Sequence, residues 1–197
     1  MTTNDIVIAD TVAWLERAVI GLNLCPFAKS VHVKGQVHYA VSRATTEEAL
    51  LEDLIIELKD LAELDAKARD TTLLIAPDGL QDFLEFNDFL ERADQALVDL
   101  DLDGELQIAS LHPHYQFAGT SEDDITNFTN RSPYPTLHLL REDSIDRAVA
   151  AFPNPESIFE VNMQTMEKLG AAGWAALKVG RTPAHESDVA SSADEHP

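Results

Sequence analysis

Three acid-free segments of this chain contain its candidate reactive side chains. The chain has 35 acidic and 14 basic residues and a formal net charge of -21, yet residues 17–46, 106–121 and 125–141 contain no Asp or Glu. Basic side chains in such segments are not neutralised by a sequence neighbour and can attract a negatively charged ligand. We therefore expect the three segments to form the walls of one site for a small anionic molecule.

The only cysteine, Cys25, lies in the first of these segments and is followed by Pro26. A thiol at the N-terminus of a new helix has a lowered pKa and can act as a nucleophile. A thiol placed just after the end of the preceding helix is inert, and apolar neighbours favour a buried lining residue instead. Nucleophilic use of Cys25 requires activation by Lys29 and by a base such as His112.

His112 stands at the end of a predicted strand, two residues before His114. We interpret His112 as a candidate general acid or base, with Cys25 as its catalytic partner. One alternative is a metal site shared with His114 and completed by Asp123, Asp124 or His138. Pairs of the form HxH are common, so we assign no metal ligand. The other alternative is a fixed structural hydrogen bond of His112 at the start of the following loop.

The run from residue 127 to residue 135, NFTNRSPYP, is the most distinctive of the chain. Arg131 offers a planar fork of donors that suits phosphate or carboxylate. The predicted substrate-binding residues are Arg131, Asn130, Asn127, Tyr115, Lys29 and Arg17. The alternative is a self-satisfied loop, in which the Asn side chains bond the local backbone and Arg131 pairs with Asp123 or Asp124.

The hydrophobic periodicity predicts a single α/β domain, with a small mixed or mostly parallel sheet of about four strands and packed helices. Strands are expected at about 36–43, 71–76, 105–111 and 136–141, and helices at about 11–22, 45–69, 81–100, 144–151 and 155–170. Two right-handed crossovers follow from this order, and ligands bind beyond the carboxyl ends of such strands. The loop 112–135 leaves from that edge, so His112 and Arg131 are expected close together. The direction of the fourth strand stays open.

Length and composition set the domain boundaries. We expect a flexible N-terminus over residues 1–9, one domain over 10–172 and a disordered acidic tail over 180–197. No apolar run approaches the roughly 20 residues of a membrane helix, and no basic leader is present, so a soluble cytoplasmic protein is expected. The negative charge argues against nucleic-acid and membrane partners. No Gly-rich phosphate loop, HExxH or GxSxG motif is present, so no cofactor is indicated.

Three long motifs resemble a known family. They are WLERAVIGLNLCPFA at residues 14–28, HPHYQFA at 112–118 and TNRSPYPTLHLLRE at 129–142. Together they resemble the bacterial proteins grouped as domain of unknown function 1415, over about residues 10–172. The resemblance implies a bacterial cytoplasmic protein. It supplies no established activity, ligand or catalytic residue.

Two hypotheses about function follow. In the first, the protein is an enzyme, a hydrolase or transferase, that acts on a small anionic metabolite. Arg131 holds the anion, His112 moves protons, and Cys25 is a nucleophile or a lining residue. In the second, the protein is a non-catalytic ligand-binding or adaptor protein. Its partner surface is then the loop 112–135, which we call the motif loop. The adaptor hypothesis predicts exposed aromatic rings at Tyr115 and Tyr134.

Overall fold

Four strands form one mixed sheet in the order β1-β2-β4-β3. The computed structural model describes residues 2–151, 154 and 157–183. The strands are β1 (Val37–Val41), β2 (Thr71–Ile75), β3 (Leu106–Leu111) and β4 (Thr136–Arg141). β1 and β2 are parallel, whereas β4 lies between β2 and β3 and is antiparallel to both. The predicted fold class is confirmed, and the open question about the fourth strand is resolved as antiparallel.

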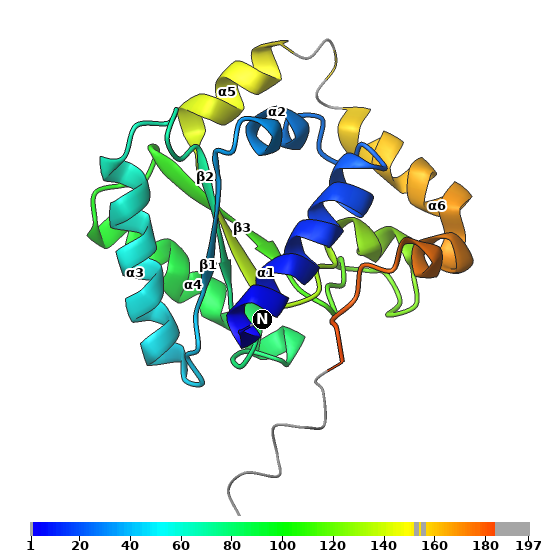
Figure 1. Cartoon of the computed structure of the whole chain (residues 1–197), viewed down its shortest axis with the longest axis horizontal. Helices are drawn as coiled ribbons and strands as arrows, with labels where there is room; N and C mark the ends of the chain where they lie inside the picture. The colour runs from blue at the N-terminus through cyan, green and yellow to red at the C-terminus, as the bar shows by residue number, and fades with distance from the viewer. Residues whose placement is uncertain (1, 152–153, 155–156, 184–197) are drawn as a thin grey trace, which may run out of the picture.

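Helices α3 (Glu47–Glu63) and α4 (Phe83–Asp99) cover one face of the sheet. Right-handed crossovers from β1 to β2 and from β2 towards β3 place both helices on the same side (Figure 1). In α3 the inward positions 50, 54, 58 and 61 are all leucine and all at most 1% exposed. Each such fully buried side chain contributes about 1.5–3 kcal/mol, so this layer supplies much of the core.

The opposite face is covered by the two ends of the chain. Helix α1 (Thr3–Trp14) continues into the π-helix η1 (Leu15–Ile20), and α2 (Ala28–Val33) follows. Near the other end, α6 (Ser157–Leu177) packs beside η1, so that Trp14, Ala18 and Val179 share one buried cluster (Figure 1). The sheet is therefore enclosed between a layer built from the chain's middle and a layer built from its two ends.

The N-terminal residues differ from the expectation. Residues 3–9 were expected to be flexible, but they form the first turns of α1. Thr2 caps this helix in a capping box with Asp5, which satisfies amide groups that a free terminus leaves open. Val7 is only 3% exposed and packs on the sheet. The capping box and the burial of Val7 therefore order a segment that was expected to be flexible.

Other boundaries differ by a few residues. The helix expected at 45–69 is α3, which has Thr46 as its N-cap and ends at Glu63. Gly170 has φ 62°, so it breaks α6 as expected, but a further helical segment follows and reaches Leu177. Helix α5 spans Glu142–Ala151. In the described part of the chain, no helix is long and apolar enough to cross a membrane.

The region beyond residue 180 was expected to be a disordered tail. Residues 180–183 instead continue the ordered chain, and Arg181 and Thr182 bond to residues far away in sequence. Residues 184–197 lie outside the described residues. The domain therefore extends about ten residues further than the expected boundary at 172.

Candidate functional site

The strand register brings the predicted site segments to one edge of the sheet. Val41, Ile75 and Leu111, at the carboxyl ends of three strands, lie in one row with Thr136, the first residue of β4. The loop 112–135 leaves and re-enters the sheet at this edge. It contains the 3-10 helix η2 (Ile125–Asn130) and is therefore partly regular. The strand register therefore allows the site that was expected at this edge of the sheet.

His112 is fully buried at the start of that loop. Its Nε2 lies 3.1 Å from the carbonyl oxygen of Leu80, and its Nδ1 accepts a hydrogen bond from the backbone N–H of His114 at 3.0 Å. Such partners fit a neutral ring protonated at Nε2. Burial lowers the pKa of His112 to about 4, against a hydrogen bond to Leu80 that raises it. With both ring nitrogens occupied, the geometry favours the structural alternative for His112.

Cys25 follows η1 and is partly buried. It does not cap a helix, because α2 begins at Ala28 with Phe27 as its N-cap residue. No hydrogen bond joins Cys25 to His112 among the described residues, and both nitrogens of His112 have other partners. The activated nucleophile–base pair is thus not assembled in this structure, and catalytic roles for the two residues stay a prediction.

Arg131 is held in place by backbone carbonyl groups. Its Nε donates to Tyr115 O at 3.1 Å, and its Nη2 donates to Glu122 O at 2.8 Å. The guanidinium lies 4.2 Å from the ring centroid of Phe128. Burial lowers the pKa of Arg131, partly offset by Glu122 and Asp123, and an arginine remains charged at neutral pH. The proposed pairing with Asp123 or Asp124 is absent among the hydrogen bonds of the described residues.

The asparagines organise the loop from within. Asn127 is fully buried; its Oδ1 accepts from Phe117 N and Thr120 Oγ1, and its Nδ2 donates to Ser121 O. The backbone carbonyl group of Asn130 accepts a hydrogen bond from the backbone N–H of His112 at 3.2 Å, which closes the loop at its base. These bonds correspond to the self-satisfied loop that the sequence left as an alternative.

Two other predicted binding residues lie elsewhere. Arg17 Nη1 donates to Leu177 O and Lys178 O, at the negative end of the α6 dipole. Lys29 is exposed on α2. Both residues therefore lie outside the walls of the pocket described below. Tyr115 is partly buried and Tyr134 is buried, so the exposed rings that the adaptor hypothesis requires are not both present.

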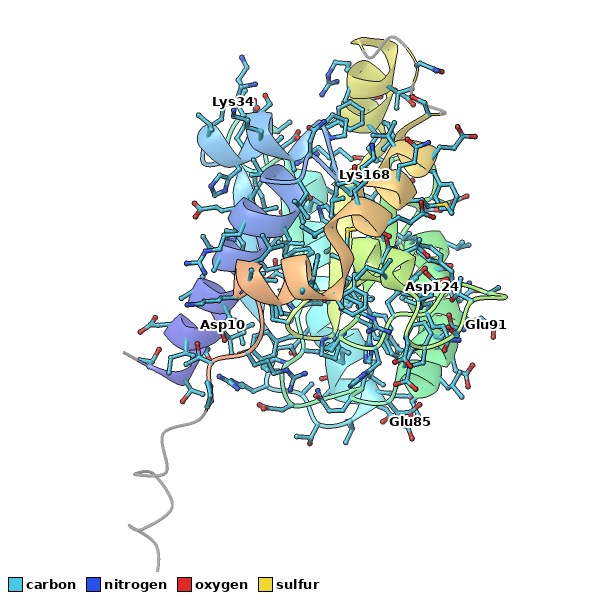
Figure 2. The ribbon with its side chains drawn as sticks, turned by 90° about the vertical axis from the view of Figure 1, so that its right-hand side faces the viewer. Asp10, Lys34, Glu85, Glu91, Asp124 and Lys168 are labelled. Atoms are coloured by element: carbon cyan, nitrogen blue, oxygen red, sulfur yellow. The ribbon has the colours of Figure 1, made fainter. Side chains whose placement is uncertain are left out.

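A segment missed by the sequence reasoning crosses the same edge. Thr182 donates to Asp10 twice, from its N at 2.8 Å and from its Oγ1 at 2.5 Å. The hydroxyl group of Tyr134 donates to the same carboxylate at 2.7 Å. Figure 2 shows Asp10 on α1 beside this segment, which follows α6. We call residues 178–182 the strap, because they join α1 to the motif loop.

Arg181 of the strap is anchored in the same way as Arg131. Its Nε donates to Pro133 O at 2.6 Å, its Nη2 donates to Gln81 Oε1 at 2.8 Å, and its guanidinium lies 4.7 Å from the Tyr134 ring centroid. Burial lowers the pKa of Arg181, and Tyr134 and Asp78 raise it. The sequence contained an indication that this segment belongs to the site, since residues 168–185 are also free of Asp and Glu.

The loop, α6 and the strap line an open pocket of about 290 Å³. We call it the arginine pocket. Its walls are Pro113, Phe128, Arg131, Ser132, Pro133, Trp174, Val179, Gly180 and Arg181. No wall residue is acidic, although the chain has more than twice as many acidic as basic residues. The structure thus brings Arg131 to a pocket, next to the unpredicted Arg181 and Trp174, while Cys25 and His112 are not among the walls.

The metal alternative finds no geometric support in the ranges described. Both ring nitrogens of His112 have hydrogen-bond partners, and His138 bonds Thr71 Oγ1 at 2.8 Å. Across residues 2–151, 154 and 157–183, no group of three His, Cys, Asp or Glu side chains converges.

The fold and these motifs define the class of protein. It is an α/β protein whose site segments meet at the carboxyl edge of a mixed sheet. A family model described as protein of unknown function (DUF1415) matches residues 6–176. The chain belongs to this family, as the three sequence motifs indicate. No curated protein and no solved structure matches the chain.

Proposed function

We propose that this protein binds a small anionic molecule in the arginine pocket. The observation that supports the proposal is the pair of guanidinium groups in its walls. Arg131 and Arg181 use Nε and Nη2 for uncharged oxygen acceptors. Among the described residues, Nη1 of each group forms no hydrogen bond, and neither group forms an ion pair with a carboxylate. Two fixed cations with free donors suit a carboxylate or a phosphate.

Anchoring by carbonyl groups strengthens this interpretation. A flexible surface arginine loses side-chain entropy when it grips an anion. Here the loop and the strap have already fixed both groups, so less entropy is lost on binding. The partial burial of Arg131 also weakens the screening by water and salt that makes exposed ion pairs weak.

Binding is favoured over the hydrolase or transferase hypothesis because of His112. Proton transfer by this ring requires that it first break its bond to Leu80 O or to His114 N. The ring is also enclosed by Phe83 and Phe86, with centroids 5.4 Å and 5.0 Å away. A binding function needs no such rearrangement.

The test is a titration of the purified protein with inorganic phosphate and citrate, followed by calorimetry and thermal unfolding. Ionic strength is held constant with sodium chloride, because any salt screens the self-repulsion of a chain with charge -21. The wild type is expected to bind at least one of the two anions. Arg181→Gln is expected to weaken that binding about tenfold, equivalent to about 1.4 kcal/mol.

The matched control is Arg92→Gln, on α4. Arg92 is also an arginine in the wall of a hollow, but it pairs with Glu47 and Glu48. It should leave anion binding unchanged. The proposal fails if neither these two anions nor the carboxylates tested below bind at constant ionic strength, or if the Arg92 and Arg181 variants lose equal affinity.

A further inference from the structure

The arginine pocket is only partly a charged site. Besides its two arginines it is walled by rings and aliphatic groups: Phe128, Trp174, Pro113, Pro133 and Val179. Phe128 and Trp174 meet edge to face, with centroids 5.2 Å apart and an interplanar angle of 73°. A ligand that presented only a hydrated anion would leave these walls facing water. The walls therefore suit a molecule that also has an apolar part.

Each guanidinium lies against a ring on one side. Arg131 is 4.2 Å from the centroid of Phe128, and Arg181 is 4.7 Å from that of Tyr134. A ring contact of this kind holds a guanidinium in place, and because Nε and Nη2 already bond protein oxygens, it leaves Nη1 and the second face for a ligand. A flat ligand can thus meet the Nη1 donors with its anion and a planar surface with its ring.

Trp174 adds a directional donor to the apolar wall. The other tryptophan, Trp14, donates its indole N–H to Arg131 O at 2.8 Å. Among the described residues, the indole N–H of Trp174 donates to no acceptor, although the side chain is partly buried in the pocket wall. This N–H is not among the buried unpaired polar atoms of the described residues, so it is open to solvent and can donate to a ligand oxygen.

We infer that the ligand of this pocket is a small planar carboxylate, with an aromatic or heteroaromatic ring carrying the acid group. The carboxylate meets Arg131 and Arg181, and the flat ring lies against Trp174. A volume of about 290 Å³ is at the lower end for ligand pockets and fits a molecule of one or two rings rather than a dinucleotide. The inference rests on the proposed anion-binding function and adds the planar, apolar requirement to it.

The probes that test this inference are benzoate, cyclohexanecarboxylate, acetate and benzamide. Benzoate and cyclohexanecarboxylate have the same charge and similar size, but only benzoate is flat. Benzamide keeps the ring and removes the charge. Affinities are measured by calorimetry at constant ionic strength. Benzoate is expected to bind about tenfold more tightly than cyclohexanecarboxylate, and more tightly again than acetate or benzamide, because stacking and charge both contribute.

Two substitutions at Trp174 separate the ring from its N–H. Trp174→Leu should weaken benzoate about tenfold and leave acetate unchanged. Trp174→Phe keeps an aromatic surface and should retain part of the preference for benzoate. The chain has two tryptophans, so a ¹H–¹⁵N spectrum contains two indole signals, and Trp174→Phe identifies one of them. Benzoate should shift the Trp174 signal more than the Trp14 signal.

The outcomes distinguish the inference from the proposed function. Equal affinity for benzoate, cyclohexanecarboxylate and acetate overturns the planar requirement and leaves anion binding standing. Unchanged benzoate binding in Trp174→Leu also overturns the inference. Benzamide that binds as tightly as benzoate contradicts the anion-binding function itself. Failure of benzoate, acetate, phosphate and citrate alike overturns both.

Discussion

Two hollows of this protein are lined by arginine, and they differ in the groups that bond to the guanidinium. The groove between α3 and α4 has a volume of about 230 Å³ and is lined by Leu51, Ile55, Arg92, Gln95, Ala96, Asp99 and Leu100. Arg92 Nη1 lies 2.7 Å from Glu47 and 3.4 Å from Glu48. In the arginine pocket, Arg131 and Arg181 are held by uncharged oxygens instead.

The difference shows how a strongly acidic chain can keep a local positive charge. The α3–α4 groove lies between two helices with acidic outer faces, so its arginine finds carboxylates within reach, and their hydrogen bonds raise its pKa. The arginine pocket is built from segments without acidic residues. There, three backbone carbonyl groups and the side-chain oxygen of Gln81 provide the anchors without cancelling the charge. Whether an arginine is available to a ligand therefore depends on whether the segments around it contain acidic residues.

The largest expected effect comes from reversing one charge in each hollow. Arg181→Glu places a carboxylate where the ligand's own is proposed to lie, so anion affinity should fall at least about 100-fold, or about 2.7 kcal/mol. Arg92→Glu makes the same change of net charge in the α3–α4 groove and should leave affinity unaltered. Calorimetry with benzoate measures both. Equal losses would show that net charge, and not the pocket, controls binding.

The next effect is a pH dependence of stability that comes from two histidines, His112 and His138, and not from the α3–α4 groove. Burial lowers the pKa of His112 to about 4 and that of His138 to about 4, below the ordinary value of 6.5. Between pH 6.5 and 4 these two histidines bind protons in the unfolded chain but stay neutral in the folded protein. The free energy of unfolding therefore falls as the pH falls. The expected loss from pH 7 to 5 is at most about 2 kcal/mol for each histidine.

Urea unfolding at pH 7 and pH 5 measures this loss. His112→Asn keeps an acceptor near the position of Nδ1 and removes the titrating ring, so the difference between the two pH values should shrink by about half. Leu51→Ala, in the α3–α4 groove, should leave the difference unchanged. The same pH difference in His112→Asn as in the wild type would contradict the buried, neutral histidine.

A smaller effect is expected from the anchors of Arg131. Arg131→Gln removes donors to Tyr115 O and Glu122 O, together with the stack on Phe128. We expect a loss of about 1.5 kcal/mol in the free energy of unfolding, since hydrogen bonds from charged groups are worth more than neutral ones. Arg92→Gln removes two largely exposed ion pairs and a more distant contact with the Phe89 ring, and should cost less. Chemical denaturation measures both, and a larger loss for Arg92→Gln would reverse the comparison.

The smallest effect concerns the strap. Thr182→Val keeps the shape of the side chain and its backbone N–H, but it removes the hydroxyl donor to Asp10. The expected cost is about 1 kcal/mol, because one hydrogen bond is lost and the carboxylate keeps two other donors. Hydrogen exchange of the backbone amide at position 182, compared between the wild type and the variant, measures this cost. Faster exchange in the variant should be confined to the strap and absent from the α3–α4 groove.

Much of the fold was predictable because its elements are short and locally coded. The four strands were predicted within about one or two residues, since each is a run of β-branched or apolar residues between polar turns. The insertion of β4 between β2 and β3 was not predictable. A loop from residue 112 to residue 135 can return to the sheet in either direction, and only packing decides the outcome.

The candidate site was predictable only in part. Arg131 was identified because its loop has a distinctive composition. The strap was missed because residues 178–182 have no periodic pattern, and because the Thr182–Asp10 bonds span 172 positions of sequence. Roles assigned to Cys25 and His112 came from residue chemistry alone. Residue type does not reveal that the His112 ring nitrogens are already used by Leu80 and His114.

The central position of β4 has a consequence for the order of events during synthesis. Strands β2 and β3 are separated by β4 and have no ladder with each other. When β3 has left the ribosome, three strands are free to fold, and β3 still lacks its sheet neighbour. The strap emerges some forty residues after β4 and must then reach back to α1. The pocket is thus the last part of the protein to be assembled, and a nascent chain acquires its sheet before it can acquire its ligand.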